Sequence, residues 1–187
     1  MEEQELINKL RKGDETAFRL LVEEYRNKVY STALNILHNR EEAEDAAQEC
    51  FMQVYTGIQH FKGDSKLSTW IYRIVVYKSL EKLRKSKLNQ KLLQWLPWWM
   101  PDEKKQSTAG FMNPGTSFEN KEKASKLFKA IDALPANQKM AFVLVRMEGF
   151  KHEEAGEIMK LSIKAVESLL SRARENLKKK LESFYHQ

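Results

Sequence analysis

The chain has 187 residues, 42% of them hydrophobic and 31% charged, with a formal net charge of +6 at pH 7. A single cysteine, Cys50, excludes an internal disulfide and a metal site made of several cysteines. The first residues are acidic, and no apolar run approaches the roughly 20 residues of a membrane span, so we expect a cytoplasmic protein without a signal peptide or a membrane span.

Composition and charge vary along the chain. Few glycines and prolines interrupt a sequence rich in Leu, Ala, Glu, Lys and Arg, which favours helices. Residues 1–50 hold 7 basic and 12 acidic side chains, whereas residues 51–91 hold 9 basic and 2 acidic ones. An acidic segment before a basic one suggests two partners of different charge, although solvated helix faces produce the same pattern.

Three amphipathic helices are predicted in the first half of the chain. The first follows Asp14, a suitable N-cap, and keeps its apolar spacing as far as Ile36. The second spans about 41–58, and the third runs from about Ser68 to beyond Arg84. The inner stripe of the second helix is expected to be Ala43, Ala47, Cys50, Val54 and Ile58.

Residues 86–118 interrupt the helical pattern. Prolines and glycines break the period and polar residues fill much of the rest, so we predict a flexible linker. Trp95, Trp98 and Trp99 are unusual in a free linker. They fit either a short additional helix packed on the first domain or a contact with another protein.

Helices resume near Phe118, and a strongly apolar one is expected to stop at Gly149. Two further helices, at about 152–160 and 163–183, have the spacing of a helix-turn-helix. The fold class is therefore all-α, with two helical domains joined by a flexible linker and a helix-turn-helix in the C-terminal domain. The boundaries are placed at 1–92 for the first domain, 93–118 for the linker and 119–187 for the second domain.

Three motifs, in this order, resemble the extracytoplasmic-function (ECF) sigma factors of bacterial RNA polymerase. The first is Ala43-Glu44-Asp45-Ala46-Ala47-Gln48-Glu49-Cys50-Phe51, which is similar to the polymerase-binding helix of that family. The second is Phe61-Lys62-Gly63-Asp64-Ser65 leading into Ser68-Thr69-Trp70-Ile71-Tyr72-Arg73-Ile74, which is similar to the segment that melts and reads the −10 element. The third is Ala133-Leu134-Pro135 with the helix-turn-helix ending in Arg172-Ala173-Arg174, which is similar to the −35 recognition domain.

The resemblance implies a non-enzymatic initiation factor that directs core RNA polymerase to promoter DNA. It also implies a partner that inhibits many members, an anti-sigma factor that is often membrane-bound. The polymerase-binding face implied by the first motif lies opposite the apolar stripe of its helix. An ordinary solvated face would have the same composition. The expected polymerase-binding residues are Asp45, Gln48, Glu49, Phe51 and Met52.

Aromatic and cationic side chains mix in the −10 segment. Unstacked bases need flat partners, and the DNA backbone needs positive charge. Gly63 allows a tight turn, with hydrogen-bonding groups beside it for a base edge. Trp70 has an alternative as an ordinary core residue. The expected −10 residues are Lys62, Asp64, Ser65, Lys66, Trp70, Tyr72, Arg73, Tyr77 and Lys78.

The polar face of the last helix is expected to enter the major groove at the −35 element. Ser162 has an alternative as the N-cap of that helix. Glu167 and Leu169 stand where the family usually has basic residues, and Lys160 where a turn glycine is frequent. Glu167 would either accept from a cytosine amino group or repel phosphate. The expected −35 residues are Ser162, Lys164, Ser168, Ser171, Arg172 and Arg174.

No catalytic or metal-binding constellation is visible in the sequence. Four histidines are scattered without ligand spacing, and there is no phosphate-binding glycine loop or nucleophile motif. We therefore expect no cofactor and no catalytic residues. Two other classes remain to be weighed: a one-component DNA-binding regulator with a helical dimerisation or ligand domain, and a helical hydrolase.

Overall fold

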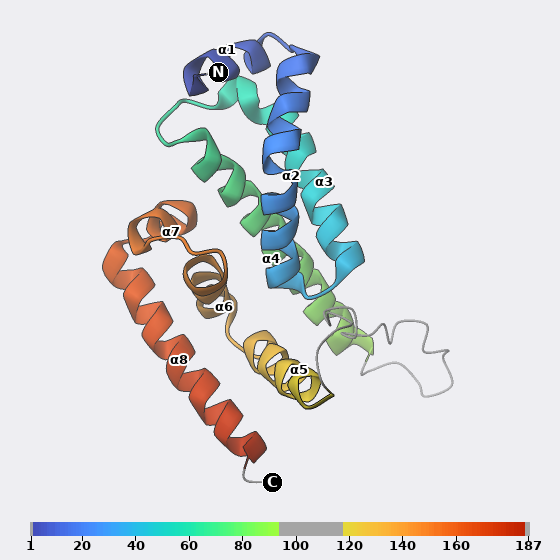
Figure 1. Cartoon of the computed structure of the whole chain (residues 1–187), viewed down its shortest axis with the longest axis vertical. Coiled ribbons are helices and arrows are strands. Elements are labelled where there is room, and N and C mark those ends of the chain that lie inside the picture. Colours follow the sequence, from blue (N-terminus) through green and yellow to red (C-terminus); the bar gives the residue numbers. More distant parts are fainter. Residues whose placement is uncertain (1, 94–117, 186–187) are drawn as a thin grey trace.

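The computed structural model describes the backbone of residues 2–93 and 118–185, and the side chains of residues 2–85 and 125–182. All the regular elements within these ranges are helical (Figure 1). None of the helices described there has the length and apolar character needed to cross a lipid bilayer. The three linker tryptophans lie outside the described residues.

The N-terminal half folds as four α-helices and one short 3-10 helix. The elements are α1 (Glu3–Arg11), α2 (Glu15–Leu37), α3 (Arg40–Gly57), η1 (Ile58–His60) and α4 (Leu67–Leu93). The Asp14 carboxylate caps α2 by accepting hydrogen bonds from the backbone N–H groups of Thr16 and Ala17, at 2.9 and 3.0 Å. The expected N-cap is thereby confirmed.

Helix α1 was not among the predicted elements. Its buried residues are Leu6, Ile7 and Leu10, which share one face of a nine-residue helix. So short a helix has little stability of its own and depends on packing against neighbouring elements. One such link is the hydrogen bond that the Arg11 side chain donates to the backbone oxygen of Phe61, 50 residues away in the chain.

The core of the N-terminal half lies between α2, α3 and α4. The predicted inner stripe of α3 is confirmed, since Ala43, Cys50 and Val54 are fully buried and Ala47 and Ile58 are nearly so. Burial raises the pKa of the Cys50 thiol to about 12, so this thiol stays protonated and unreactive at neutral pH.

The C-terminal half is also helical. It consists of α5 (Phe118–Asp132), α6 (Ala136–Phe142), the π-helical turn η3 (Val143–Met147), α7 (His152–Met159) and α8 (Ile163–Tyr185). The predicted stop is confirmed: the chain leaves η3 through Gly149, whose φ of +77° is accessible to glycine at little cost.

The turn between α7 and α8 is tight. Lys160 adopts a left-handed conformation with φ of 55°, which explains why a glycine would suit this position. A Cβ at Gly156 would lie 2.9 Å from the backbone oxygen of Leu161. The small residue is therefore needed for the close approach of the turn to α7. Ser162 caps α8, its hydroxyl accepting from the N–H of Ala165 at 3.3 Å.

The two halves pack against each other. In Figure 1, α7 lies beside the middle of α4, and the two helices are in contact. One continuous core runs from Leu6 through Leu80 in the N-terminal half to Met140 and Leu170 in the C-terminal half. A second, smaller core joins α5 to α8 through Ile131, Leu134 and Leu177, among others. This association was not foreseen from the sequence.

Candidate functional site

The outer face of α3 presents mixed polar and apolar side chains. Asp45, Gln48 and Met52 are exposed on it, with Met52 at 69%. Tyr55, one turn further along, is 52% exposed and meets the edge of the Phe18 ring at a centroid distance of 5.0 Å. Phe51 is half-buried against the core. An accessible face of this kind can bind another protein.

Glu49 belongs to the same face but is tied to α4. Its carboxylate lies 2.9 Å from Lys82 Nζ and 3.6 Å from Lys78 Nζ, and Lys82 also lies 3.7 Å from Asp45. The hydrogen bond from Lys82 lowers the pKa of Glu49 below its usual range. Two residues predicted to contact different partners, Glu49 and Lys78, are therefore held together by one ion-pair cluster.

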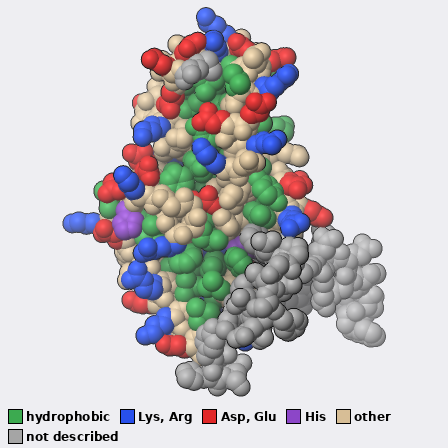
Figure 2. Space-filling model, viewed as in Figure 1, with side chains coloured by type: hydrophobic (Ala, Val, Ile, Leu, Met, Phe, Trp, Pro, Cys, Tyr) green, Lys and Arg blue, Asp and Glu red, His purple; other side chains and the backbone are tan. Residues whose placement is uncertain are grey.

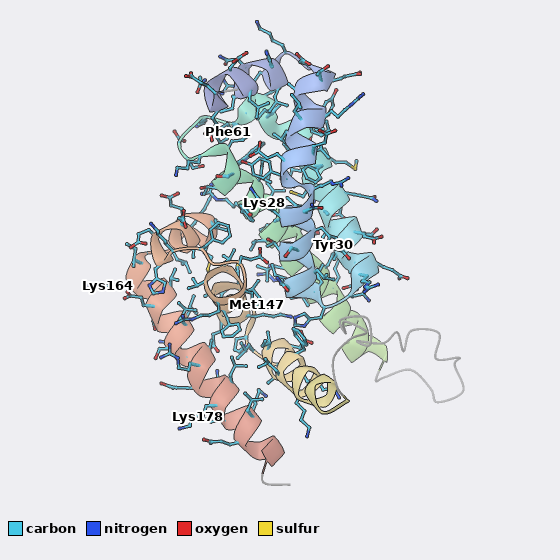
Figure 3. All side chains as sticks on the ribbon, in the orientation of Figure 1. Lys28, Tyr30, Phe61, Met147, Lys164 and Lys178 are labelled. Atoms are coloured by element: carbon cyan, nitrogen blue, oxygen red, sulfur yellow. The ribbon has the colours of Figure 1, made fainter. Side chains whose placement is uncertain are left out.

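The turn before α4 is open to solvent. Lys62, Asp64 and Lys66 are exposed and Ser65 is half-buried, while Gly63 takes a φ of +81°. The structure thus brings a bend, two cations and two hydrogen-bonding side chains together at the surface, in the arrangement expected from the sequence. Phe61, labelled in Figure 3, is buried beneath this turn.

Trp70 is half-buried beside Phe61. The two ring centroids are 5.0 Å apart, and a Cβ at Gly57 would lie 3.4 Å from the Trp70 ring. The indole therefore packs as part of the core edge, as its alternative interpretation allowed. The uncovered part of the ring remains beside the turn.

The other residues of α4 that were predicted to contact the −10 element differ in their surroundings. Tyr77 is 64% exposed. Tyr72 is only 8% exposed, because its ring packs edge-to-face on Phe150 at 4.6 Å, and burial raises the pKa of its hydroxyl to about 12. Arg73 donates from Nη2 to the backbone oxygen of Glu157 in α7 across 2.8 Å. Tyr72 and Arg73 thus contact the C-terminal half.

The outer face of α8 is polar and basic. Exposed side chains on it are Lys164, Glu167, Ser168, Ser171, Arg172, Arg174, Lys178 and Lys179. Figure 2 shows Lys and Arg side chains along the lower outer edge of the molecule, where α8 runs. Lys164 and Lys178, labelled in Figure 3, lie on the side of α8 turned away from α6. This face suits the phosphates and base edges of a DNA groove.

Glu167 lies near a histidine at the start of α7. His152 Nδ1 lies 3.7 Å from its carboxylate, and the Glu167 side chain is 56% exposed. The carboxylate therefore remains accessible to a ligand.

Two acidic residues that the sequence did not single out join the two halves. Glu148 accepts hydrogen bonds from Asn35 at 2.6 Å and from Ser31 at 3.4 Å. Asp132 lies 2.7 Å from His38 Nδ1 and 2.6 Å from Lys139 Nζ. The partners from α2 and its C-cap are 94 to 117 positions away in the chain, so no local pattern could have revealed them.

The described part of the chain contains no candidate metal-binding site. No group of three or more His, Cys, Asp or Glu side chains that could hold a metal ion occurs among those residues.

Comparisons with known proteins match both halves of the chain. Residues 21–88 match the family described as Sigma-70 region 2, and residues 125–177 match Sigma-70, region 4. The chain is 30% identical to the ECF RNA polymerase sigma factor SigW of Bacillus subtilis, covering 94% of each protein. It is 28% identical to the RNA polymerase sigma-H factor of Pseudomonas aeruginosa, covering 97% of this chain and 94% of the relative.

Two solved structures share the fold. CnrH, in complex with the cytosolic domain of CnrY, superposes with a TM-score of 0.66 at 19% identity, covering 97% of each chain. The sigma factor RpoE of Bartonella quintana, in complex with the anti-sigma factor NepR, gives a TM-score of 0.66 at 22% identity over 88% of this chain and 96% of that one.

Proposed function

Because this chain belongs to the ECF sigma factors of bacterial RNA polymerase, we propose which of its surfaces meet each partner. An ECF sigma factor is a non-enzymatic transcription initiation factor that binds core RNA polymerase and promoter DNA. Region 2 binds the −10 element and region 4 the −35 element. We place region 2 at residues 1–92, the linker at 93–118 and region 4 at 119–187.

The outer face of α3 contacts the polymerase in this proposal. Asp45, Gln48 and Met52 carry it because they are exposed. Phe51 contributes the part of its ring that the core does not cover. Glu49 contributes mainly by holding Lys78 and Lys82 against α3. A face with an acidic residue, an amide and an apolar side chain can combine charge complementarity with burial on a protein partner.

The turn 62–66 and the nearby part of α4 contact the −10 element. Asp64 and Ser65 offer hydrogen-bonding groups to an extruded base, and Lys62 and Lys66 attract the backbone. Tyr77, which is 64% exposed, offers an accessible aromatic surface, and Trp70 lies at the edge of the turn. Lys78 adds positive charge from α4. Tyr72 and Arg73 join this surface once Phe150 no longer covers the first and α7 no longer binds the second.

The outer face of α8 contacts the −35 element. Its exposed Lys164, Ser168, Ser171, Arg172 and Arg174 lie on the second helix of a helix-turn-helix, the element that enters the major groove. Ser162 contributes as the cap that fixes the start of the helix. The single observation that carries the assignment is that this polar, basic face stays uncovered while the opposite face of α8 is buried.

We also propose that this chain is held inactive by an anti-sigma factor and acts in the cytoplasm. Two structures that share its fold are titled as complexes, one with the anti-sigma factor NepR and one with the cytosolic domain of CnrY. A protein that works on core polymerase and promoter DNA meets both in the cytoplasm.

Run-off transcription with purified core polymerase tests the proposed function. Transcripts from candidate promoters are expected only when this protein is added, and they should disappear when the −35 element is scrambled. A one-component regulator would instead bind a symmetric DNA site tightly without polymerase. Strong binding by the protein alone, with no transcripts at any candidate promoter, would refute the proposal.

A further inference from the structure

A partly exposed apolar side chain lies at the start of the −35 helix. Ile163, the first residue of α8, is 43% exposed, and Leu161 two residues earlier is 38% exposed. The core between α7 and α8 is filled by other residues. Those residues are Ala155, Ile158, Val166 and Leu170, all buried.

The surroundings of Ile163 place it where base edges are read. The N-terminal residues of the second helix in a helix-turn-helix are the ones that contact base edges. Ser162, Lys164 and Glu167, around Ile163, are exposed polar residues. The start of α8 is fixed by the left-handed turn at Lys160 and by the cap at Ser162.

The major groove offers one apolar feature to such a side chain. Among the groups by which the four bases are distinguished there, the C5 methyl of thymine is the apolar one. We propose that Ile163 recognises a thymine methyl in the −35 element, so that it helps determine promoter specificity. This inference rests on the proposed role of α8 in binding the −35 element.

The test removes the thymine methyl and changes nothing else on the base. Each thymine of a functional −35 element is exchanged, one at a time, for deoxyuridine, which lacks only that methyl. Binding of the reconstituted holoenzyme to these promoters is then measured. Burial of one methyl group is worth about 0.8 kcal/mol, so one exchange should weaken binding by about fourfold. With Ile163→Ala, the same exchange should have no effect.

Lys164→Ala serves as the matched control on the neighbouring position. It should weaken binding to thymine and deoxyuridine promoters alike and leave their ratio unchanged. The inference is wrong if no thymine is sensitive, or if Ile163→Ala keeps the wild-type ratio. A holoenzyme whose binding ignores the whole −35 element would instead refute the proposed role of α8.

A second inference rests on the contact between the two regions. Phe150 covers the Tyr72 ring, Arg73 is bonded to the backbone of Glu157, and Glu148 accepts from Asn35. Each of these contacts joins region 2 to region 4. The first two cover the part of the proposed DNA surface on α4 that carries Tyr72 and Arg73, while the outer face of α8 stays exposed.

We infer that this packing is an autoinhibitory contact that withholds Tyr72 and Arg73 from −10 DNA. The closed chain presents its −35 surface but an incomplete −10 surface. When the regions separate, Asp132 loses its contact with His38 but keeps its ion pair with Lys139, because both of these residues belong to region 4. For a protein that binds only when open, the apparent affinity equals the affinity of the open form multiplied by the fraction of molecules that are open. The inference rests on the proposed −10 role of Tyr72 and Arg73.

The test uses the full chain carrying Phe150→Ala with Glu148→Ala. Affinity for the single-stranded non-template strand of the −10 region of a mapped promoter should rise at least threefold, and the radius of gyration from X-ray scattering should increase. The exposed Glu153→Gln on α7 is the control and should leave both unchanged.

Two outcomes would overturn the autoinhibitory contact. One is a chain that expands without a gain in affinity, and the other is a double variant that stays compact and binds as wild type. Failure of the proposed −10 role would look different: exchanging Tyr72 and Arg73 for alanine would leave the binding of the −10 strand by the holoenzyme unchanged.

Discussion

Asp132, the last residue of α5, lies 2.7 Å from Nδ1 of His38, the residue that ends α2 in a left-handed conformation. The same carboxylate oxygen lies 2.6 Å from Lys139 Nζ, whose side chain is only 3% exposed. Burial alone would raise the pKa of Asp132, but the hydrogen bonds from His38 and Lys139 outweigh it, so the pKa falls below its usual range. One carboxylate thus links region 2 to two elements of region 4.

Asp132→Ala should lower the free energy of unfolding by about 2 kcal/mol, measured by urea denaturation. Removing one member of a buried ion pair typically costs about 3–5 kcal/mol, and the 33% exposure of Asp132 reduces that figure. Lys139→Met, which replaces the charge by an apolar side chain of similar length, should cost less. An unchanged free energy of unfolding in Asp132→Ala would contradict a paired role for the carboxylate.

The contribution of Asp132 should also depend on pH. Because its pKa is lowered in the folded chain, its stabilisation is complete above the usual value of 3.8 and is lost as pH falls through the folded-state value. The difference in unfolding free energy between the wild type and Asp132→Asn should therefore be constant from about pH 5 to 7, because Asp132 is ionised in both the folded and the unfolded chain there. It should shrink below about pH 4. A difference that grows on acidification would show the opposite sign and refute the ion pair.

Asp45→Lys combined with Gln48→Ala should weaken binding to core polymerase about tenfold, because a reversed charge on the outer face of α3 opposes complementarity with a basic partner surface. Binding is measured by titration of labelled protein with core enzyme, and far-UV circular dichroism checks the fold. Glu23→Gln, an exposed change on α2, is the control. Unchanged affinity in the double variant would remove this face from the interface.

Arg172→Ala should reduce transcription from promoters that need the −35 element by about tenfold, the loss expected for one charged contact with DNA of about 1–3 kcal/mol. The side chain is exposed on α8, so the fold should be unaffected. The comparison template is a promoter that works without the −35 element, on which the variant should equal the wild type. A loss confined to that template would place Arg172 elsewhere.

Lys160→Gly should raise the stability of the protein by about 0.5–1 kcal/mol, since a non-glycine residue in the left-handed region costs about 1–2 kcal/mol and part of this is lost to the flexibility of glycine. Thermal unfolding measures the change. Lys179→Gly, at an exposed position in the middle of α8, should destabilise the protein by about 1 kcal/mol. Destabilisation by Lys160→Gly would mean that the turn does not keep the φ of 55°.

Local features of the fold were readable from the sequence because they depend on residues close together in the chain. The spacing of apolar residues predicted the inner stripe of α3, and Asp14 marked the start of α2. Glycine at 149 marked the end of the apolar segment before α7. The three motifs in order were enough to indicate the family, which the comparisons confirm. The roles of individual site residues stay predictions.

Helix α1 was missed because a helix of nine residues has a weak local signal and is stabilised by distant contacts such as that of Arg11 with Phe61. The sequence also placed Tyr72 and Tyr77 in the same class, as aromatic residues of one basic helix. Their exposures of 8% and 64% differ because Phe150 covers only the first of them.

The sequence by itself therefore indicated the helices other than α1, the helix-turn-helix and the family, since each follows from periodicity and short-range motifs. Only the tertiary structure decided which candidate residues are accessible and which are held between the two regions. The physical reason is that burial and pairing depend on partners that are distant in the chain, such as Asn35 and Glu148 or Arg73 and Glu157, and no local pattern encodes those partners.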